Sequence, residues 1–472
     1  MKILNLEIKG VTCNSKEVKP GYAFVAIKGS CQDGNRFIKE AVARGAGIII
    51  VEKKIPKIKI IFAKTKLVAV DDCRKFLAQA ALKFYGSPAD KIKVIGITGT
   101  NGKTTVSYLI EAIAKECGHP CGVIGTINYR FKGKVIAAKN TTPGPEQLQK
   151  LLAQMYARGV KYCAMEVSSH ALDQDRVAGI NFSQAVFTNL TQDHLDYHKN
   201  FENYFSAKAK LFSGLPEKSC AIINADDQYA CRIKQLTKAR IITYGVEKEA
   251  MVIAKNINFG MQSTEFSLAT PKINLKVKTH LVGRHNIYNI LAAVCWGLSE
   301  NLPTAKIKSA IEKFKNVPGR LEKINCKKGF NIFVDYAHTP DALFNVIRSL
   351  RQLVEGKIMV IFGCGGERDK LKRPQMGKIV NDLADYAIIT SDNPRSENPD
   401  QIIKDIQKGM EKNNYLIIPQ RLAAIRKGLS LANKGDCLLI AGKGHEDYQI
   451  LKNKIIHFSD RKAAEDCLKL MK

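Results

Sequence analysis

The sequence lacks the features that mark several classes of protein. No apolar run approaches the roughly 18 residues that a membrane-spanning helix needs, and the first residues contain no signal-peptide hydrophobic segment. No internal repeat and no low-complexity segment is found, and 45% of the residues are hydrophobic, which excludes a fibrous or a disordered chain. We therefore expect a globular protein of the cytoplasm, without membrane insertion.

Cysteine is sparse and is not arranged in pairs. The 472 residues include 13 cysteines, and no two of them form a CxxC motif. Cys117 and Cys121 are the closest two, but no second pair or histidine stands at the spacing of a zinc site. We expect most of these cysteines to be small buried side chains in a reducing compartment, without a disulfide or zinc framework.

Acidic residues are few relative to basic ones, with 44 Asp and Glu against 74 Lys and Arg and a net charge of +30. A basic chain favours polyanionic partners such as nucleic acid. The excess is spread along the whole chain as isolated lysines, which is typical of a solvated surface. We therefore predict no nucleic-acid partner, although the positive charge of the protein would attract small anionic substrates.

Three α/β units are predicted along the chain, since a length of 472 residues suits two to four domains. The breaker cluster at Gly86–Pro88 and the segment Val317–Arg320 mark the boundaries. The predicted units are therefore 1–89, 90–317 and 318–472. Apolar runs alternate with helical patterns in all three, which favours a doubly wound parallel sheet in the second unit and a Rossmann-like third unit.

The element predictions rest on apolar runs for strands and on 3.6-residue periodicity for helices. Residues 251–281 alternate as antiparallel strands do. The predicted strands are 23–27, 47–51, 67–70, 93–98, 162–167, 184–188, 219–224, 332–334, 357–362, 386–390 and 437–441. The predicted helices are 37–44, 73–85, one starting near 103, 286–300, 341–354 and 398–412.

A phosphate-binding loop is predicted between the strand at 93–98 and the helix that follows. Counted from Gly96, the spacing to Gly102 is one residue longer than in the usual Walker motif, but the core Gly99–Thr104 is intact. The glycines let backbone N–H groups close on a phosphate, Lys103 supplies a positive charge, and the hydroxyl of Thr104 can bind Mg²⁺.

The sequence closely resembles the Mur ligase family, to which folylpolyglutamate synthase is related. The resemblance extends over essentially the whole chain. The segments that carry it are Gly99–Thr105, Asn140–Pro143, Met165–His170, Thr188–His198, Gly283–Asn289, Val317–Glu322, Asp335–His338, Asp392–Arg395 and Gly442–Glu446.

The resemblance implies a three-domain α/β protein with a small N-terminal uridine-binding domain, a central P-loop-type ATPase domain and a C-terminal Rossmann-like domain. It implies an ATP-dependent amide ligase that adds meso-2,6-diaminopimelate to UDP-N-acetylmuramoyl-L-alanyl-D-glutamate, through an acyl phosphate and a tetrahedral intermediate. The alternatives are a family member that adds L-lysine and a folylpolyglutamate synthase-like ligase. The expected partners are these small molecules only, and we expect a monomer.

For ATP and its metal ions, the resemblance implies two Mg²⁺ sites. Thr104 and Glu166 would bind one ion and His194 would serve the second, while Lys208 would carry a CO₂-derived carbamate that contacts Mg²⁺. The catalytic residues implied are Lys103, Glu166, His194 and Lys208. The ATP contacts implied are Gly99, Thr100, Asn101, Gly102, Lys103, Thr104, Thr105, Asn286, Asn289, Arg320 and Asp335.

The other two substrates are assigned residues in the same way. The residues implied for the UDP-sugar dipeptide are Ser15, Asn140, Thr141, Thr142, Ser168, Gln174 and Arg176. Around Ser15 the sequence departs from the family, with Asn14, Lys16 and Asn35 where an acidic residue, Arg and His are usual. The residues implied for diaminopimelate are Arg368, Asp392, Asn393, Pro394, Arg395, Gly442 and Glu446.

The choice between diaminopimelate and L-lysine depends on one carboxylate at the distal end of the amino acid. A site that accepts this carboxylate needs a cation, preferably an arginine that grips it with two hydrogen bonds. Arg395 supplies that cation, and Glu446 can accept from the distal ammonium. The sequence therefore favours diaminopimelate.

Overall fold

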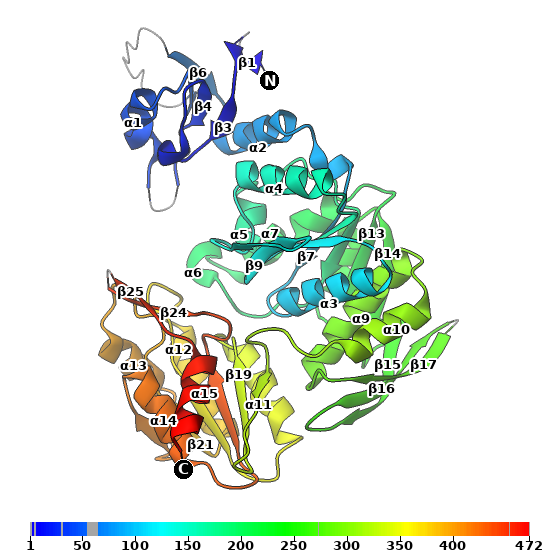
Figure 1. The fold of residues 1–472 in the computed structure, drawn as a ribbon, viewed down its shortest axis with the longest axis vertical. Coiled ribbons are helices and arrows are strands. Elements are labelled where there is room, and N and C mark those ends of the chain that lie inside the picture. Colours follow the sequence, from blue (N-terminus) through cyan, green and yellow to red (C-terminus); the bar gives the residue numbers. More distant parts are fainter. Residues whose placement is uncertain are drawn as a thin grey trace.

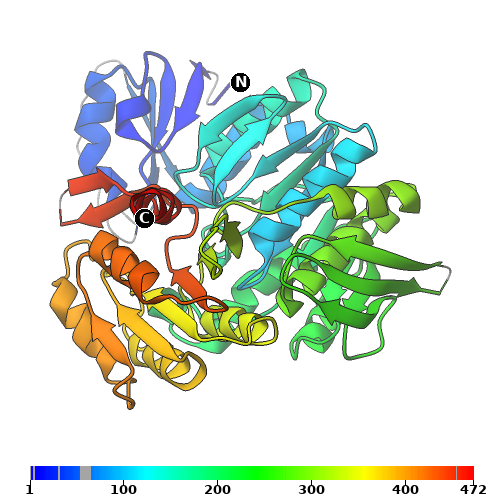
Figure 2. The same cartoon turned by 60° about the horizontal axis from the view of Figure 1, so that its bottom comes forward.

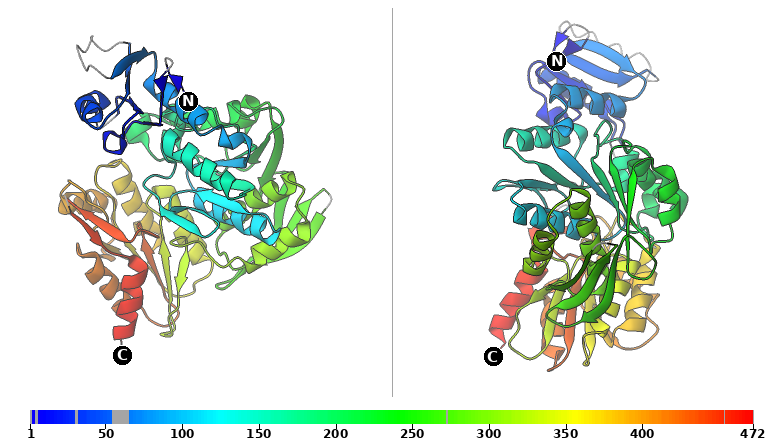
Figure 3. Two further views of the ribbon diagram at one scale, coloured as in Figure 1. Left: turned by 45° about the horizontal axis from the view of Figure 1, so that its top comes forward. Right: turned by 90° about the vertical axis from the view of Figure 1, so that its right-hand side faces the viewer.

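The computed structural model describes residues 2–3, 6–29, 32–53, 65–271, 273–452 and 454–471. These residues form a four-stranded, an eleven-stranded and a six-stranded sheet, together with two short hairpins. Figure 1 shows the three sheets following one another from the N-terminus to the C-terminus, and the two termini lie at opposite ends of the molecule in Figures 1 and 3. The α/β fold class predicted from the sequence is confirmed.

The N-terminal unit is a small parallel sheet with helices packed on it. Its core joins apolar residues of the strands to α2, whose first turn is capped by the Asp72 carboxylate. The sheet has the order β3 (Gly10–Thr12), β4 (Tyr22–Val25), β5 (Ile48–Glu52) and β6 (Lys66–Val70). The unit also contains β1 (Lys2–Ile3), β2 (Leu6–Glu7), α1 (Ile38–Ala43), α2 (Cys73–Phe84) and short 3-10 helices at Ser15–Glu17 and Gly34–Phe37.

The central sheet is parallel in its middle and antiparallel at both edges. Its order is β10 (Lys134–Ala137), β9 (Asn128–Phe131), β8 (Cys121–Ile124), β11 (Tyr162–Glu166), β7 (Lys93–Thr98), β12 (Gln184–Phe187), β13 (Cys220–Asn224), β14 (Arg240–Gly245), β15 (Val252–Phe259), β16 (Thr264–Thr270) and β17 (Ile273–Thr279). The antiparallel strands expected within 251–281 are β15, β16 and β17, which Figure 2 shows as a green extension of this unit.

Helices cover both faces of the central sheet, as expected of a doubly wound arrangement. One core contains apolar residues of α3, α9 and α10, and the opposite core contains residues of α4 and α7. The helices are α3 (Lys103–Glu116), α4 (Pro145–Ala157), α5 (Ser169–Asp173), α6 (Leu195–His198), α7 (Phe201–Ser213), α8 (Ala230–Leu236), α9 (Arg284–Ser299) and α10 (Thr304–Lys313).

The C-terminal unit has a second three-layer arrangement. Its sheet order is β18 (Glu322–Ile324), β19 (Asn331–Asp335), β23 (Cys437–Ala441), β20 (Ile358–Phe362), β21 (Tyr386–Ile389) and β22 (Tyr415–Ile417), with β24 (Tyr448–Leu451) and β25 (Lys454–His457) as a separate hairpin. One face packs on α11 (Pro340–Arg351), α12 (Lys372–Leu383) and α13 (Pro399–Gln407), and the other packs on α14 (Arg421–Leu431) and α15 (Asp460–Leu470).

The predicted elements agree closely with these bounds, with one clear difference. The helix predicted over 398–412 ends at Gln407. Gly409 follows the cap residue Lys408, and a Cβ there would collide with the carbonyl oxygen of Pro374, so the chain leaves the helix where it passes close to α12. In the described part of the chain, no helix is long and apolar enough to span a membrane.

Candidate active site

The phosphate loop connects β7 to α3 and is shaped by two glycines. Gly99 has φ +147° and Gly102 has φ +90°, and a side chain on either would collide with Thr188 or with Asn289. The amide of Asn101 donates to Oδ1 of Asn189 at 2.9 Å, which ties the loop to the end of β12. The N-terminus of α3 therefore stays open towards the cleft, as phosphate binding requires.

Two lysines lie against this loop. Nζ of Lys103 donates to the carbonyl oxygens of Gly99 and Thr100 at 2.7 and 2.8 Å, and Nζ of Lys208 donates to Gly99 at 2.8 Å. Lys208 projects from α7 over the ring of Tyr204 and is 1% exposed. Burial, followed by repulsion from Lys103, lowers the pKa of Lys208 well below its usual value.

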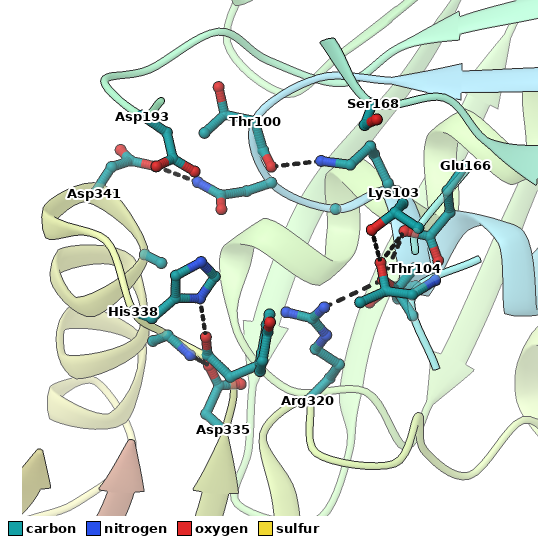
Figure 4. A pocket seen from close by; sticks show the side chains of 18 of the residues that line it. Thr100, Lys103, Thr104, Glu166, Ser168, Asp193, Arg320, Asp335, His338 and Asp341 are labelled. Carbon is teal, nitrogen blue, oxygen red and sulfur yellow. Dashed lines mark hydrogen bonds between the residues drawn. The ribbon is translucent and has the colours of Figure 1, made fainter. Parts of the chain in front are cut away.

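A buried carboxylate ends β11 beside the loop. Glu166 is 1% exposed, and its Oε2 accepts from the hydroxyls of Thr104 at 3.1 Å and Thr126 at 2.9 Å, while its Oε1 accepts from the amide of Thr126 at 3.0 Å. Figure 4 shows Thr104 and Glu166 facing each other next to Lys103. A hydroxyl and a carboxylate oxygen are donors that suit Mg²⁺.

Within the described ranges, no group of three or more His, Cys, Asp or Glu side chains could hold a metal ion by themselves. Mg²⁺ commonly binds to one or two protein carboxylates and to the phosphate oxygens of a substrate. The donor pair of Thr104 and Glu166 therefore fits an ion that arrives with a nucleotide.

His194 follows β12 and precedes α6 in a left-handed conformation, with φ +55°. Burial lowers its pKa to about 3, so its imidazole is neutral near pH 7 and has a lone pair that can bind a metal ion. Its Nε2 lies 3.4 Å from Oδ2 of Asp193. Burial opposes ionisation of Asp193, but His194, Lys372 and His338 outweigh it and hold the pKa of Asp193 below its usual range.

A chain of hydrogen bonds runs from Glu166 to Arg176. The hydroxyl of Thr142 donates to the carbonyl of Glu166 at 2.8 Å and accepts from the amide of Ser168 at 3.0 Å. Nη1 of Arg176 donates to the carbonyl of Thr142 at 3.0 Å, and its Nη2 donates to Oε1 of Gln174 at 2.6 Å. Thr142 thus connects Ser168, Gln174 and Arg176, which are assigned to the UDP-sugar dipeptide, to the backbone of Glu166.

The C-terminal unit reaches across to the phosphate loop. Nη2 of Arg320 donates to the hydroxyl of Thr104 at 3.1 Å, and its guanidinium lies over the ring of Tyr336. Nδ2 of Asn101 donates to Oδ2 of Asp341 at 2.7 Å, a contact between the loop and the start of α11. The central and C-terminal units are therefore in contact at the phosphate loop.

Asp335 ends β19 and is 6% exposed. Its two carboxylate oxygens accept from the amides of Leu321 at 2.6 Å and Ala337 at 2.7 Å, and burial raises its pKa. In this structure the carboxylate therefore orders the turn around Arg320, and its contact with ATP stays a prediction.

The residues assigned to the amino acid lie in the segments that follow β20, β21 and β23. Nη1 of Arg395 donates to the carbonyls of Gly366 at 2.6 Å and Asn393 at 3.4 Å, while φ at Arg395 is +52°. Nδ2 of Asn393 donates to Oε2 of Glu446 at 2.9 Å. A non-glycine residue in the left-handed region often marks a functional site, and here it turns the arginine towards the cleft.

One cavity of about 1080 Å³ joins these groups. Among the residues that the sequence assigned, its lining includes Thr100, Asn101, Gly102, Lys103, Thr104, Thr105, Asn140, Thr141, Glu166, Ser168, His194, Lys208, Asn286, Asn289, Arg320, Asp335, Arg368, Asp392, Asn393, Arg395, Gly442 and Glu446. The assigned residues that do not line it are Ser15, Gly99, Thr142, Gln174, Arg176 and Pro394. Ser15 lies in the N-terminal unit, where its hydroxyl donates to Glu40 at 2.7 Å.

Three family models match the chain. They are described as Mur ligase family, catalytic domain (residues 7–85), Mur ligase middle domain (97–297) and Mur ligase, glutamate ligase domain (319–444). A UDP-N-acetylmuramoyl-L-alanyl-D-glutamate–2,6-diaminopimelate ligase from Aquifex aeolicus is 44% identical, with 98% of this chain and 94% of the relative aligned. One from Clostridium botulinum is 43% identical, covering 98% and 95%.

The chain belongs to the Mur ligase family. The predicted family is therefore confirmed. A solved structure described as a UDP-N-acetylmuramoyl-L-alanyl-D-glutamate–2,6-diaminopimelate ligase is 31% identical and superimposes with a TM-score of 0.68, covering 98% of this chain and 95% of that one.

Several residues at the site of this Mur ligase were not singled out from the sequence. Thr126 follows β8 and binds both oxygens of Glu166, and Asp341 binds the phosphate loop. Lys443 is fully buried beneath the amino-acid residues, with its Nζ 3.0 Å from Oε2 of Glu446. The signal for Asp341 and Lys443 was present, because Asp341 lies shortly after the Asp335–His338 motif and Lys443 lies inside the Gly442–Glu446 motif.

Proposed function

We propose that this Mur ligase is an ATP-dependent acid–amino-acid ligase that joins meso-2,6-diaminopimelate to UDP-N-acetylmuramoyl-L-alanyl-D-glutamate. The reaction belongs to peptidoglycan-precursor synthesis in the cytoplasm. Curated relatives at 43–44% identity over nearly the whole chain are named for this activity. ATP is the co-substrate, and the product side yields ADP and phosphate.

The observation that carries the proposal is the joint lining of one cavity. The phosphate loop and Glu166 of the central unit line it together with Arg368, Arg395 and Glu446 of the C-terminal unit. A carboxylate activated at the phosphate loop can therefore meet an amine held by the C-terminal unit without leaving the cavity. Such proximity converts the attack into an effectively intramolecular step.

The chemistry has two steps. A carboxylate oxygen of the dipeptide attacks the γ-phosphorus of ATP, the bond to the bridging oxygen breaks, and ADP leaves. The amine of the amino acid then attacks the acyl carbon, and the tetrahedral intermediate expels phosphate as the nitrogen loses its proton. Lys103 and Arg320 lie where they can stabilise the negative charge on the migrating phosphoryl group.

Mg²⁺, held by Thr104 and Glu166 with His194 and Lys208 nearby, would reduce the repulsion between the anionic carboxylate and the ATP phosphates when bound. Two Mg²⁺ sites are proposed. Lys208 is proposed to carry a carbamate, which would replace a buried cation by an oxygen ligand. Its lowered pKa supports this, because only the neutral amine adds CO₂.

The three units have separate tasks in this proposal. Residues 1–89 bind the uridine end through Ser15, residues 90–317 bind ATP and the dipeptide, and residues 318–472 bind the amino acid. Each unit has its own hydrophobic core, which supports treating them as domains. The enzyme is proposed to act as a monomer on these small molecules, without nucleic acid.

A family member that adds L-lysine is the second candidate. Nη1 of Arg395 is bonded to loop carbonyls, and within the described part of the chain no hydrogen bond engages its Nε or Nη2, so both can bind a carboxylate that L-lysine lacks. A folylpolyglutamate synthase-like ligase would have no use for a uridine-binding domain or for the Asp392–Arg395 motif. Both observations favour diaminopimelate.

The proposal is tested by measuring ADP release with UDP-N-acetylmuramoyl-L-alanyl-D-glutamate and a panel of amines. We expect turnover that needs the UDP-sugar dipeptide, Mg²⁺ and meso-diaminopimelate together. ADP release that needs a folate substrate, or that proceeds without any UDP-sugar, would contradict the assignment.

A further inference from the structure

A single buried arginine joins the two loops that carry the amino-acid residues. We name these the 392 loop (Asp392–Arg395) and the 442 loop (Gly442–Glu446). Arg421 begins α14, and its Nη2 donates to the carbonyl of Ala441 at 2.9 Å, while its Nη1 donates to the carbonyl of Ser391 at 3.4 Å. Each of these carbonyls belongs to the residue that immediately precedes one of the loops.

The same guanidinium forms a two-pronged ion pair with the start of α15. Nε and Nη2 of Arg421 lie 2.7 Å from Oδ1 and Oδ2 of Asp460, and both side chains are fully buried. Burial of two charges is costly, and a well-packed apolar pair is often at least as stable. Stability alone therefore does not explain this ion pair. Buried charges can also fix the relative positions of the segments that they join.

The loops are packed closely against this guanidinium. Gly442 has φ +115°, and a Cβ there would lie 2.6 Å from Oδ2 of Asp392 and 3.9 Å from Nη2 of Arg421. Burial lowers the pKa of the Arg421 guanidinium, but the Asp460 carboxylate outweighs burial and keeps this pKa above its usual value. The carboxylates of Asp392 and Glu446 raise it further. A shift of Arg421 would be felt in both loops at once.

We propose that Arg421 and Asp460 are positioning residues for the amino-acid substrate, which fix the 392 loop relative to the 442 loop. The inference rests on the proposed function, since it assigns these loops to diaminopimelate. Neither residue lines the cavity, so neither contacts the substrate. Their effect passes through the carbonyls of Ser391 and Ala441 to Asn393, Arg395 and Glu446.

The expected signature is selective. If the ion pair between Arg421 and Asp460 is weakened, the 392 loop and the 442 loop can move apart. Both ends of the amino acid are then bound less tightly, and its KM rises. The ATP site is untouched, because Arg421 has no contact with the phosphate loop. A purely structural role would instead lower the melting temperature and the yield of folded enzyme while leaving the KM of the folded fraction unchanged.

The test compares Asp460→Asn and Arg421→Lys with a matched control. Asp460→Asn keeps the shape of the side chain and removes its charge, and Arg421→Lys keeps the charge and removes the fork. The control is Asp436→Asn, since Asp436 is buried at the opposite end of β23, where it accepts from the amides of Lys357 and Asn433 at 2.9 Å. All three variants remove a buried charge or fork from the same unit.

We expect Asp460→Asn and Arg421→Lys to raise the KM for meso-diaminopimelate about tenfold, which corresponds to the loss of one charge-assisted contact. The KM for ATP should stay within about twofold, and the preference for diaminopimelate over L-lysine should fall. Asp436→Asn should lower the melting temperature and leave both KM values unchanged.

An unchanged amino-acid KM in folded Asp460→Asn enzyme would overturn the inference, as would an equal rise in Asp436→Asn or a parallel rise in the KM for ATP. The proposed function is judged separately, by the amine that wild-type enzyme prefers. If that amine is not diaminopimelate, the same comparison is made with the preferred amine and still decides whether the pair positions the loops.

Discussion

The ammonium groups of Lys103 and Lys208 share one acceptor, the carbonyl oxygen of Gly99, at 2.7 and 2.8 Å. The fully buried Lys208 and the half-buried Lys103 therefore place two amino groups against a single backbone oxygen. Burial and repulsion from Lys103 lower the pKa of Lys208 well below its usual value. The arrangement favours a neutral amine at Lys208, and a neutral amine is the form that can add CO₂.

We predict that Lys208 carries a carbamate. Native mass spectrometry in bicarbonate should show one added CO₂, and Lys208→Ala should lose both the added mass and the activity. Lys210→Ala is the matched control, because Lys210 lies on the same helix with its side chain 51% exposed, and it should keep both. Full activity of Lys208→Ala after rigorous removal of CO₂ would exclude a role for the modification.

Lys103→Ala should abolish acyl-phosphate formation and leave the fold intact. Lys103 is bonded to two carbonyls of the phosphate loop and faces the cavity, and loss of its charge should raise the barrier by at least about 3 kcal/mol. The measurement is kcat for ADP release, with circular dichroism as the check on folding. Lys115→Ala, at the exposed end of the same helix, should behave as wild type. Near-normal turnover in Lys103→Ala would refute its role.

Arg395→Ala should remove the preference for meso-diaminopimelate over L-lysine. The substitution removes the guanidinium that binds the distal carboxylate, which only diaminopimelate carries. Its kcat/KM should therefore fall by about 100-fold or more, whereas the low kcat/KM for L-lysine should change little. Arg395→Lys keeps the charge without the fork and should give an intermediate ratio. Equal losses for both amino acids would point to a collapsed loop and not to lost recognition.

We expect the affinity for diaminopimelate to fall on acidification. The fall should occur at a higher pH than it would with a glutamate of ordinary pKa. Burial raises the pKa of Glu446 above its usual value, although Lys443 opposes the rise. Only above this pKa does Glu446 carry the negative charge that attracts the distal ammonium, so the KM for diaminopimelate should increase as the pH falls through it. Lys443→Gln removes the opposing charge and should move that increase closer to neutral pH. An unchanged midpoint in a KM-against-pH profile of Lys443→Gln would contradict this coupling.

The sequence predicted most strands of the parallel sheets because each is a short apolar run bounded by turn residues. The phosphate loop was predictable for a related reason: strand, glycine turn and Lys103–Thr104 are contiguous. The hairpin of β24 and β25 was not predicted, since its second strand is exposed along its whole length and carries no alternating pattern. It is held by pairing with the 392 loop, where the amide of Arg395 donates to Ile450 at 3.2 Å.

Contacts between distant segments could not be predicted in the same way. The pair of Arg421 and Asp460 joins residues 39 positions apart, and neither stands in a motif. The bond between Asn101 and Asp341 crosses between two units and depends on how they are arranged. Asp335 was assigned to ATP by resemblance, whereas the structure adds a local task for it in ordering the turn at Arg320.

The central claim is that this cavity activates a carboxylate with ATP and directs it to an amino acid with a distal carboxylate. The most direct measurement is kcat/KM of the unmutated enzyme for meso-diaminopimelate and for L-lysine, with UDP-N-acetylmuramoyl-L-alanyl-D-glutamate and MgATP held saturating. We predict a preference for meso-diaminopimelate of about 100-fold or more, the value of a buried charged contact that L-lysine cannot make. Equal kcat/KM values for the two amino acids would contradict the account.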